Sequence, residues 1–170
     1  MVAYLKMQMA AGVDGVQIFD SHGGHLLPAE FQEASGRWIT EIISQLPVGQ
    51  ASSLPESSRL EACPTIVFSL GTHGNWPDLV ASGADVIGID WQTSLAEARQ
   101  LVPPQIALQG NLSPALLAEA TPAVVATETA KVLEAMRGRP GHIFNLGHGL
   151  TPAAKLENIA ALVETVKGFK

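Results

Sequence analysis

The stretch GHIFNLGHGLTP, residues 141–152, joins a short apolar segment to a single histidine held between two glycines. Residues 142–146 have the length and composition of a buried strand. Behind the histidine, apolar residues recur at three- and four-residue steps, as in an amphipathic helix. These residues are Leu156, Ile159, Leu162, Val163 and Val166. The stretch is therefore the centre of one strand–helix unit, and the chain before it repeats the same form.

Four more apolar runs rich in Val and Ile precede this unit, and each has the pattern of a buried strand. They cover residues 13–19, 65–70, 85–90 and 105–109. The polar, Ser/Pro-rich segment 49–64 lies between two such units and is expected to be a surface loop.

Helix signals separate the predicted strands. Pro28 opens the clearest helix, whose apolar stripe comprises Phe31, Trp38, Ile39, Ile42, Ile43 and Leu46. Other helices are indicated by Ser94 with Glu97 at capping-box spacing, by Thr121–Pro122 with Gly138 as the end, and by residues 76–82. A further helix is predicted over residues 2–11, ahead of the first strand.

Strands that alternate with helices predict parallel strands joined by right-handed crossovers. Two architectures fit this pattern. A doubly wound open sheet would be complete with five strands in 170 residues, whereas a (β/α)8 barrel normally needs at least about 200 residues. Length favours the open sheet. The helix over residues 2–11 has no capping residue before it, however, which is expected of a chain that begins inside a crossover.

The composition narrows the classes of protein. With 170 residues, 46% of them hydrophobic, residues 1–170 are expected to form one domain. A net charge of −6 makes nucleic acid an unexpected partner. The single cysteine, Cys63, excludes an internal disulfide and a multi-cysteine zinc site. No apolar run approaches the roughly 20 residues that span a bilayer, and no signal peptide is evident, so no membrane partner and a cytoplasmic location are expected.

Polar residues gather where the predicted strands end. The strands run into FDSHGGHL, FSLGTHGNW, GIDW, LQGNLSP and FNLGHGLTP. Because parallel α/β folds bind ligands at the carboxyl ends of their strands, we expect a site there. The candidates are His22, His25, His73 and His148, together with Asp20, Ser21, Asn75, Asp90 and Asn111.

Most of these residues also have a structural interpretation. Asp20 and Asp90 could equally cap the following helices, and Asn111 could begin a turn. Trp76 and Trp91 could cover the core, and His142, at the start of its strand, faces the opposite end of the sheet and is expected to be structural. For His148 the functional interpretation is favoured, because glycines on both sides leave the backbone bare and let the imidazole approach a ligand.

Several motifs are absent. The segment beginning at Asp20 misses the D-x-H-x-x-G pattern of corrinoid-binding domains, because position 25 is His25. No G-x-G-x-x-G or phosphate loop occurs. A triad of Ser21, His148 and Asp90 would lack a nucleophile elbow, and no H-E-x-x-H or cysteine pair supports zinc. We therefore expect no metal.

The segments GVDGVQIFDSHGGHL, VIGIDW, ALQGNL and IFNLGHGLTP resemble the uroporphyrinogen decarboxylase family in order and spacing. The family has a β/α barrel, and the resemblance covers its C-terminal part. It therefore favours an incomplete TIM-type (β/α)8 barrel holding about the last five β/α units over the doubly wound sheet. It implies a carboxy-lyase of porphyrin and haem biosynthesis that uses no cofactor and acts on a small tetrapyrrole.

The resemblance also implies roles for three residues. Ser21 matches the serine that contacts a substrate carboxylate, and Phe19 would line the apolar wall of the cleft. His148 matches a histidine of the same cleft, where it would bind substrate and serve as the catalytic residue. The family's N-terminal arginines and its pyrrole-binding aspartate have no counterpart, so the isolated chain is expected to be inactive. A homodimer is left open.

Two alternatives remain. Methyltransferases of the same fold, which act on corrinoid proteins and thiols, carry an H-x-C zinc pair where this chain has His73-Gly74-Asn75 and a cysteine where His148 stands. The chain could instead be a non-catalytic fragment. Five open strands would then expose edge strands and an apolar face, which predicts self-association.

Overall fold

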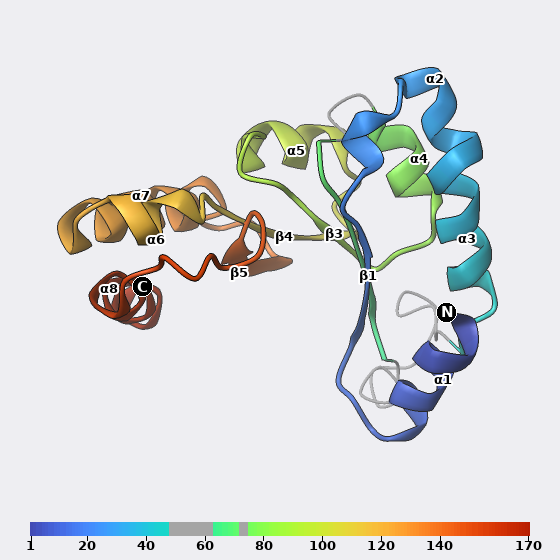
Figure 1. Cartoon of the computed structure of the whole chain (residues 1–170), viewed down its shortest axis with the longest axis horizontal. Helices are drawn as coiled ribbons and strands as arrows, with labels where there is room; N and C mark the ends of the chain where they lie inside the picture. Colours follow the sequence, from blue (N-terminus) through green and yellow to red (C-terminus); the bar gives the residue numbers. More distant parts are fainter. Residues whose placement is uncertain (48–62, 72–74) are drawn as a thin grey trace. The chain divides into compact units, whose positions relative to one another are not determined.

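The computed structural model describes residues 1–47, 63–71 and 75–170 (Figure 1). Most of the predicted surface loop 49–64 lies outside the described residues, and so does His73. No helix in the described part of the chain is long and apolar enough to cross a membrane.

Five strands form one sheet in which neighbours along the chain are neighbours in space, in the order β1-β2-β3-β4-β5. The strands are β1 (Val16–Asp20), β2 (Thr65–Ser69), β3 (Val86–Gly88), β4 (Ala107–Leu112) and β5 (His142–Leu146). The β1–β2 and β4–β5 pairs are parallel, with Val16 opposite Thr65 and Leu108 opposite His142. All five predicted strands are confirmed.

The strand order decides between the two predicted architectures. A doubly wound sheet reverses its order at a switch point, whereas these strands follow one another without a reversal. Helices alternate with the strands along the chain. This arrangement is that of part of a (β/α) barrel, as predicted.

The helices are α1 (Val2–Ala10), η1 (Gly23–His25), α2 (Pro28–Phe31), η2 (Gln32–Gly36), α3 (Arg37–Ser44), α4 (Trp76–Ala81), α5 (Leu95–Leu101), α6 (Ala115–Glu119), α7 (Pro122–Ala135) and α8 (Leu156–Gly168). Pro28 and Pro122 stand at the first helical positions, as predicted. The Ser94 hydroxyl accepts a hydrogen bond from the Glu97 N–H at 3.5 Å, the first half of the predicted capping box.

Residues 1–87 with 102–107 form one compact unit, unit 1, and residues 88–101 with 108–170 form a second, unit 2. Each is described below by itself. The expectation that residues 1–170 are a single domain stays a prediction.

In unit 1, α2, η2 and α3 run on as one long helix (Figure 1). Phe31, Ile39 and Ile43 on this helix are buried in the core. The predicted place of Trp38 in the same stripe is wrong, because its side chain is 49% exposed. The Arg37 guanidinium lies 4.6 Å from the centre of the Trp38 ring, so a cation–π contact on the outer face replaces burial.

In unit 2, α7 and α8 pack side by side (Figure 1). The apolar stripe predicted for α8 is wrong at two residues, since Leu156 is 81% exposed and Val163 is 36% exposed. The one buried residue of α8 is Asn158. Its amide nitrogen donates to the carbonyls of Leu117 and Ala120, both at 3.0 Å, so it holds the end of α6 where backbone carbonyls lack helical partners.

Candidate functional site

The first candidate residues lie at the carboxyl end of β1, in unit 1. Ser21 follows the last residue of the strand and is exposed. Phe19, the residue predicted to line an apolar wall, is 65% exposed, and its ring centre lies 6.2 Å from that of Phe68 on β2. Both side chains are thus accessible to a ligand.

Asp20, between these two residues, organises the end of the strand. One carboxylate oxygen accepts hydrogen bonds from the hydroxyls of Ser35 at 2.6 Å and Ser69 at 3.0 Å. The other accepts from the backbone N–H of His22 at 3.1 Å. The carboxylate therefore joins η2, β2 and the turn that carries Ser21. The bond to the His22 N–H is local, but the following helices η1 and α2 take no side-chain cap from Asp20, so the interpretation of Asp20 as a helix cap is wrong.

The glycines after Ser21 allow a close approach of two backbones. The Gly24 N–H donates to the Leu70 carbonyl at 2.7 Å. A Cβ atom on Gly24 would lie 2.7 Å from that same oxygen, so no larger residue fits. The turn also pairs the rings of His22 and His25, whose centres are 5.3 Å apart.

A second group of candidates lies at the carboxyl ends of β3, β4 and β5, in unit 2. Asp90 is 4% exposed. Its carboxylate accepts hydrogen bonds from the Gln92 N–H at 2.9 Å and the Thr93 hydroxyl at 3.4 Å. Asp90 therefore shapes the turn after β3, and Trp91 lies within that turn.

Asn111 is part of β4, so the prediction that it follows the fourth strand is wrong. The strand runs three residues beyond Gln109, to Leu112, and Asn111 is buried in it. Its amide nitrogen donates to the carbonyls of Asp90 at 2.9 Å and Thr93 at 2.5 Å. A buried side chain of β4 thus satisfies two carbonyls of the neighbouring turn.

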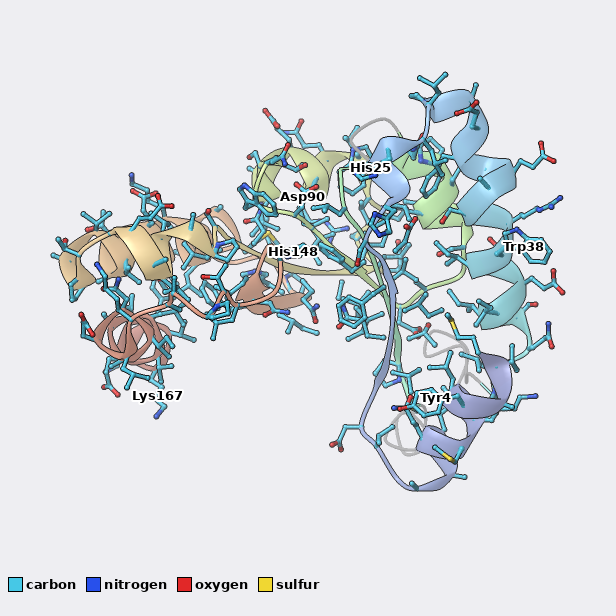
Figure 2. The ribbon with its side chains drawn as sticks, in the orientation of Figure 1. Tyr4, His25, Trp38, Asp90, His148 and Lys167 are labelled. Carbon is cyan, nitrogen blue, oxygen red and sulfur yellow. The ribbon has the colours of Figure 1, made fainter. Side chains whose placement is uncertain are left out.

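His148 is exposed and lies two residues beyond the end of β5 (Figure 2). Its ring meets the ring of Trp91 edge to face, with centres 5.9 Å apart and planes at 81°. The two flanking glycines differ in what they allow. A Cβ on Gly147 would clash with the backbone nitrogen of Trp91, whereas a Cβ on Gly149 would meet nothing within 4 Å.

His142 stands at the first position of β5, as predicted, and its Nε2 lies 2.8 Å from the Gly110 carbonyl oxygen. This contact fixes the ring against β4. It bears out the structural interpretation of His142.

Unit 2 also has an open cavity of about 330 Å³ that the sequence did not predict. Its walls come from the turn after β3, the end of β4, and helices α6 and α7. Lys131 and Glu128 in its wall form an ion pair at 2.7 Å, so the one charge neutralises the other.

No group of three or more metal-binding side chains occurs among the described residues. Cys63, just before β2, is half-buried. Burial raises the pKa of its thiol above the usual value, and the negative charges of Asp14 and Asp85 raise it further.

The predicted site residues thus fall into two groups. Phe19 and Ser21 lie at the carboxyl end of β1 in unit 1, and His148 lies beyond β5 in unit 2. That they meet at one cleft stays a prediction. The sequence did not reveal Ser35 or Ser69 as partners of Asp20, because neither belongs to a recognisable pattern. The sequence held one possible signal for Asn111, because this polar residue follows closely on the apolar run 105–109.

Comparison with known proteins supports the resemblance to the uroporphyrinogen decarboxylase family independently of the quoted segments. The family model for uroporphyrinogen decarboxylase (URO-D) matches residues 1–169. The uroporphyrinogen decarboxylase of Xanthomonas euvesicatoria pv. vesicatoria (strain 85-10) is 40% identical over 173 residues, covering 99% of this chain and 46% of that protein. The uroporphyrinogen decarboxylase of Coxiella burnetii (strain Dugway 5J108-111) is 37% identical over 169 residues, covering 99% and 44%.

Among solved structures, a methyltransferase from Methanosarcina mazei has a TM-score of 0.79 with this chain at 20% identity, covering 99% of this chain and 46% of that one. This likeness concerns the fold alone. The chain spans less than half the length of the curated relatives and matches their C-terminal part. Because the family model covers the chain almost from end to end, the chain belongs to the uroporphyrinogen decarboxylase family.

Proposed function

We propose that the protein formed by this chain with the remaining barrel units decarboxylates the acetate side chains of uroporphyrinogen III, giving coproporphyrinogen III. The observation that carries the proposal is the family match over residues 1–169. Relatives that bear the name uroporphyrinogen decarboxylase, 37–40% identical to this chain, support it.

The chemistry needs no separate electron sink, because the substrate supplies one. Protonation of a pyrrole carbon makes the ring electron-poor. The bond between the acetate methylene and its carboxylate then breaks, carbon dioxide leaves, and the electron pair moves into the ring. The methylene takes up a proton to become a methyl group, and the ring carbon loses its added proton. In total, one carboxylate and one proton become carbon dioxide and a C–H bond.

The residues of this chain would hold the substrate. Uroporphyrinogen carries many carboxylates, and these require hydrogen-bond donors. The Ser21 hydroxyl and the His148 imidazole can both donate, and both side chains are exposed beyond strand ends. Phe19, 65% exposed, would provide apolar contact with the macrocycle. His148 could donate to a carboxylate or pass a proton, since the two imidazole nitrogens can donate and accept hydrogen bonds.

We also propose that the 170 residues alone do not turn substrate over, because the chain spans 46% of its Xanthomonas relative. The methyltransferase alternative has less support, since Cys63 is the only cysteine and cannot supply the two thiols that it requires. Homodimerisation and a cytoplasmic location stay predictions. Sedimentation velocity and cell fractionation would test them.

The direct experiment joins this chain to the N-terminal part of the Xanthomonas relative and measures coproporphyrinogen formed from uroporphyrinogen. We expect product from the joined protein, none from the chain alone, and a much lower rate after His148→Asn. A folded joined protein that forms no product would contradict the proposed function. Turnover by the chain alone would contradict the second proposal. Binding of zinc by the purified chain would support the methyltransferase alternative.

A further inference from the structure

The turn after β3 is held from two directions. Asn111, on the adjacent strand β4, uses its amide N–H groups on the carbonyls of Asp90 and Thr93, at 2.9 and 2.5 Å. The Asp90 carboxylate closes the same turn through the Gln92 N–H at 2.9 Å. Trp91 lies between these anchored residues, so its backbone has little freedom to move.

The loop after β5 rests on this turn. Gly147 lies so close to Trp91 that a Cβ atom would clash with the Trp91 nitrogen and lie 2.8 Å from its Cα. His148 is the next residue, and its ring stands edge to face with the Trp91 ring at 5.9 Å. The backbone contact and the ring contact together place the imidazole relative to β3, although the His148 side chain is itself exposed.

We infer that Trp91 and Asn111 are positioning residues for His148. Trp91 restricts the imidazole by direct ring contact, and Asn111 acts one step further away by fixing the turn that carries Trp91. The inference rests on the proposed function, in which His148 contacts the substrate. A ring that is free to rotate in solvent would seldom point its N–H in one direction, whereas a ring held against a fixed indole is oriented before substrate arrives.

The interpretation makes Trp91 more than a cover for the core. Trp91 is 38% exposed. If it only covered the core, its replacement would change the stability of the chain and nothing else. If Trp91 positions His148, replacing Trp91 should instead change the environment of the His148 ring. It should have little effect on activity in a protein that lacks His148.

The first test uses the 170-residue chain and observes the ring-proton resonances of His148 by NMR, assigned with His148→Asn. Trp91→Leu and Asn111→Ala should both move these resonances, although Asn111 lies behind the turn. Trp91→Phe, which keeps an aromatic edge, should move them least. Trp38→Leu is the matched control, because Trp38 is an exposed tryptophan of unit 1, and it should leave them in place. Unmoved resonances in a folded Trp91→Leu chain would overturn the inference.

The second test measures kcat and KM in the joined protein. Trp91→Leu should lower kcat about tenfold or more, since small misplacements of a catalytic group are costly, and Trp91→Phe should restore most of the loss. In the His148→Asn background, Trp91→Leu should cost little more, because the two residues act as one unit. An equal loss in both backgrounds would refute the inference.

The two tests separate the possible failures. A joined protein that makes no coproporphyrinogen would contradict the proposed function, whereas the NMR shifts in the chain would still decide the contact of Trp91 with His148. Should Asn111→Ala fail to fold, Trp91→Leu with its Phe counterpart carries the test alone, because Trp91 is partly exposed and its replacement leaves no buried carbonyl unpaired.

Discussion

Gly147→Ala gives the sharpest test of the packing beneath His148. The added Cβ would meet the backbone of the turn after β3, at 2.8 Å from Trp91 Cα and 2.9 Å from Asp90 C, and closer still to the Trp91 nitrogen. Ordinary van der Waals contact begins at 3.4 Å, so the two loops must separate by at least about 0.6 Å to relieve the contact with the Trp91 Cα, and by more to relieve the closer contact with the Trp91 nitrogen. Backbone atoms cannot rotate away as a flexible side chain can. We expect the cost of an overpacked site, about 1–3 kcal/mol.

The assay is urea or thermal unfolding of Gly147→Ala beside Gly149→Ala. A cost of about 2 kcal/mol should lower the Tm by about 4–8 °C in a chain of this size. Gly149→Ala is the matched control, since its Cβ meets nothing within 4 Å, and it should change stability by less than about 0.5 kcal/mol. Equal unfolding midpoints for the two variants would refute the reasoning, because the flanking glycines would then be equivalent.

The other predictions concern both units. Ser35→Ala removes a 2.6 Å hydrogen bond to the Asp20 carboxylate and should cost about 1.5–3 kcal/mol in urea unfolding; an unchanged midpoint would contradict the role of Asp20 as an organiser. Asn158→Leu removes the side-chain donor to the Ala120 carbonyl, while the Leu117 carbonyl keeps the Lys155 N–H at 2.9 Å, and should cost about 1–3 kcal/mol in urea unfolding; an unchanged midpoint would contradict the role of Asn158 at the end of α6. Because its pKa is raised, the Cys63 thiol should react with iodoacetamide more slowly at pH 8 than an unhindered cysteine, and Asp14→Asn should speed the reaction by favouring the thiolate; no change in that variant would contradict a role for the Asp14 charge.

The raised pKa of Cys63 also has a consequence for stability. A thiol whose pKa is higher in the folded chain than in the unfolded one favours folding while it is protonated in both states. That contribution is present below the unfolded pKa and is lost as the pH rises through the folded pKa. Stability should therefore decline at alkaline pH less in Cys63→Ser than in the parent chain.

The two glycines beside His148 illustrate how far a sequence motif can be interpreted. The spacing Gly-His-Gly suggested that both residues keep the backbone bare for a ligand. In the structure Gly147 is required by the turn after β3, while Gly149 borders open space. Only Gly149 therefore keeps the predicted role of leaving the backbone bare for a ligand.

The alternation of strand and helix was settled by the sequence alone. Buried parallel strands need runs of β-branched residues, and the proline at a helix start is a local signal, so both can be detected without knowledge of distant residues. The five strands and the helices beginning at Pro28 and Pro122 were therefore predictable. The resemblance at the strand ends also led to the family that the comparison identified.

Tertiary structure decided what those residues touch. Asn111 binds carbonyls about 20 positions earlier, Asp20 binds a serine 49 positions later, and Trp91 meets His148 across the ends of two strands. Strand order, which excluded the doubly wound sheet, is likewise a long-range property. Local pattern fixes which elements form because helices and strands are stabilised over a few residues. Hydrogen bonds and ring contacts between distant segments exist only after those elements have packed.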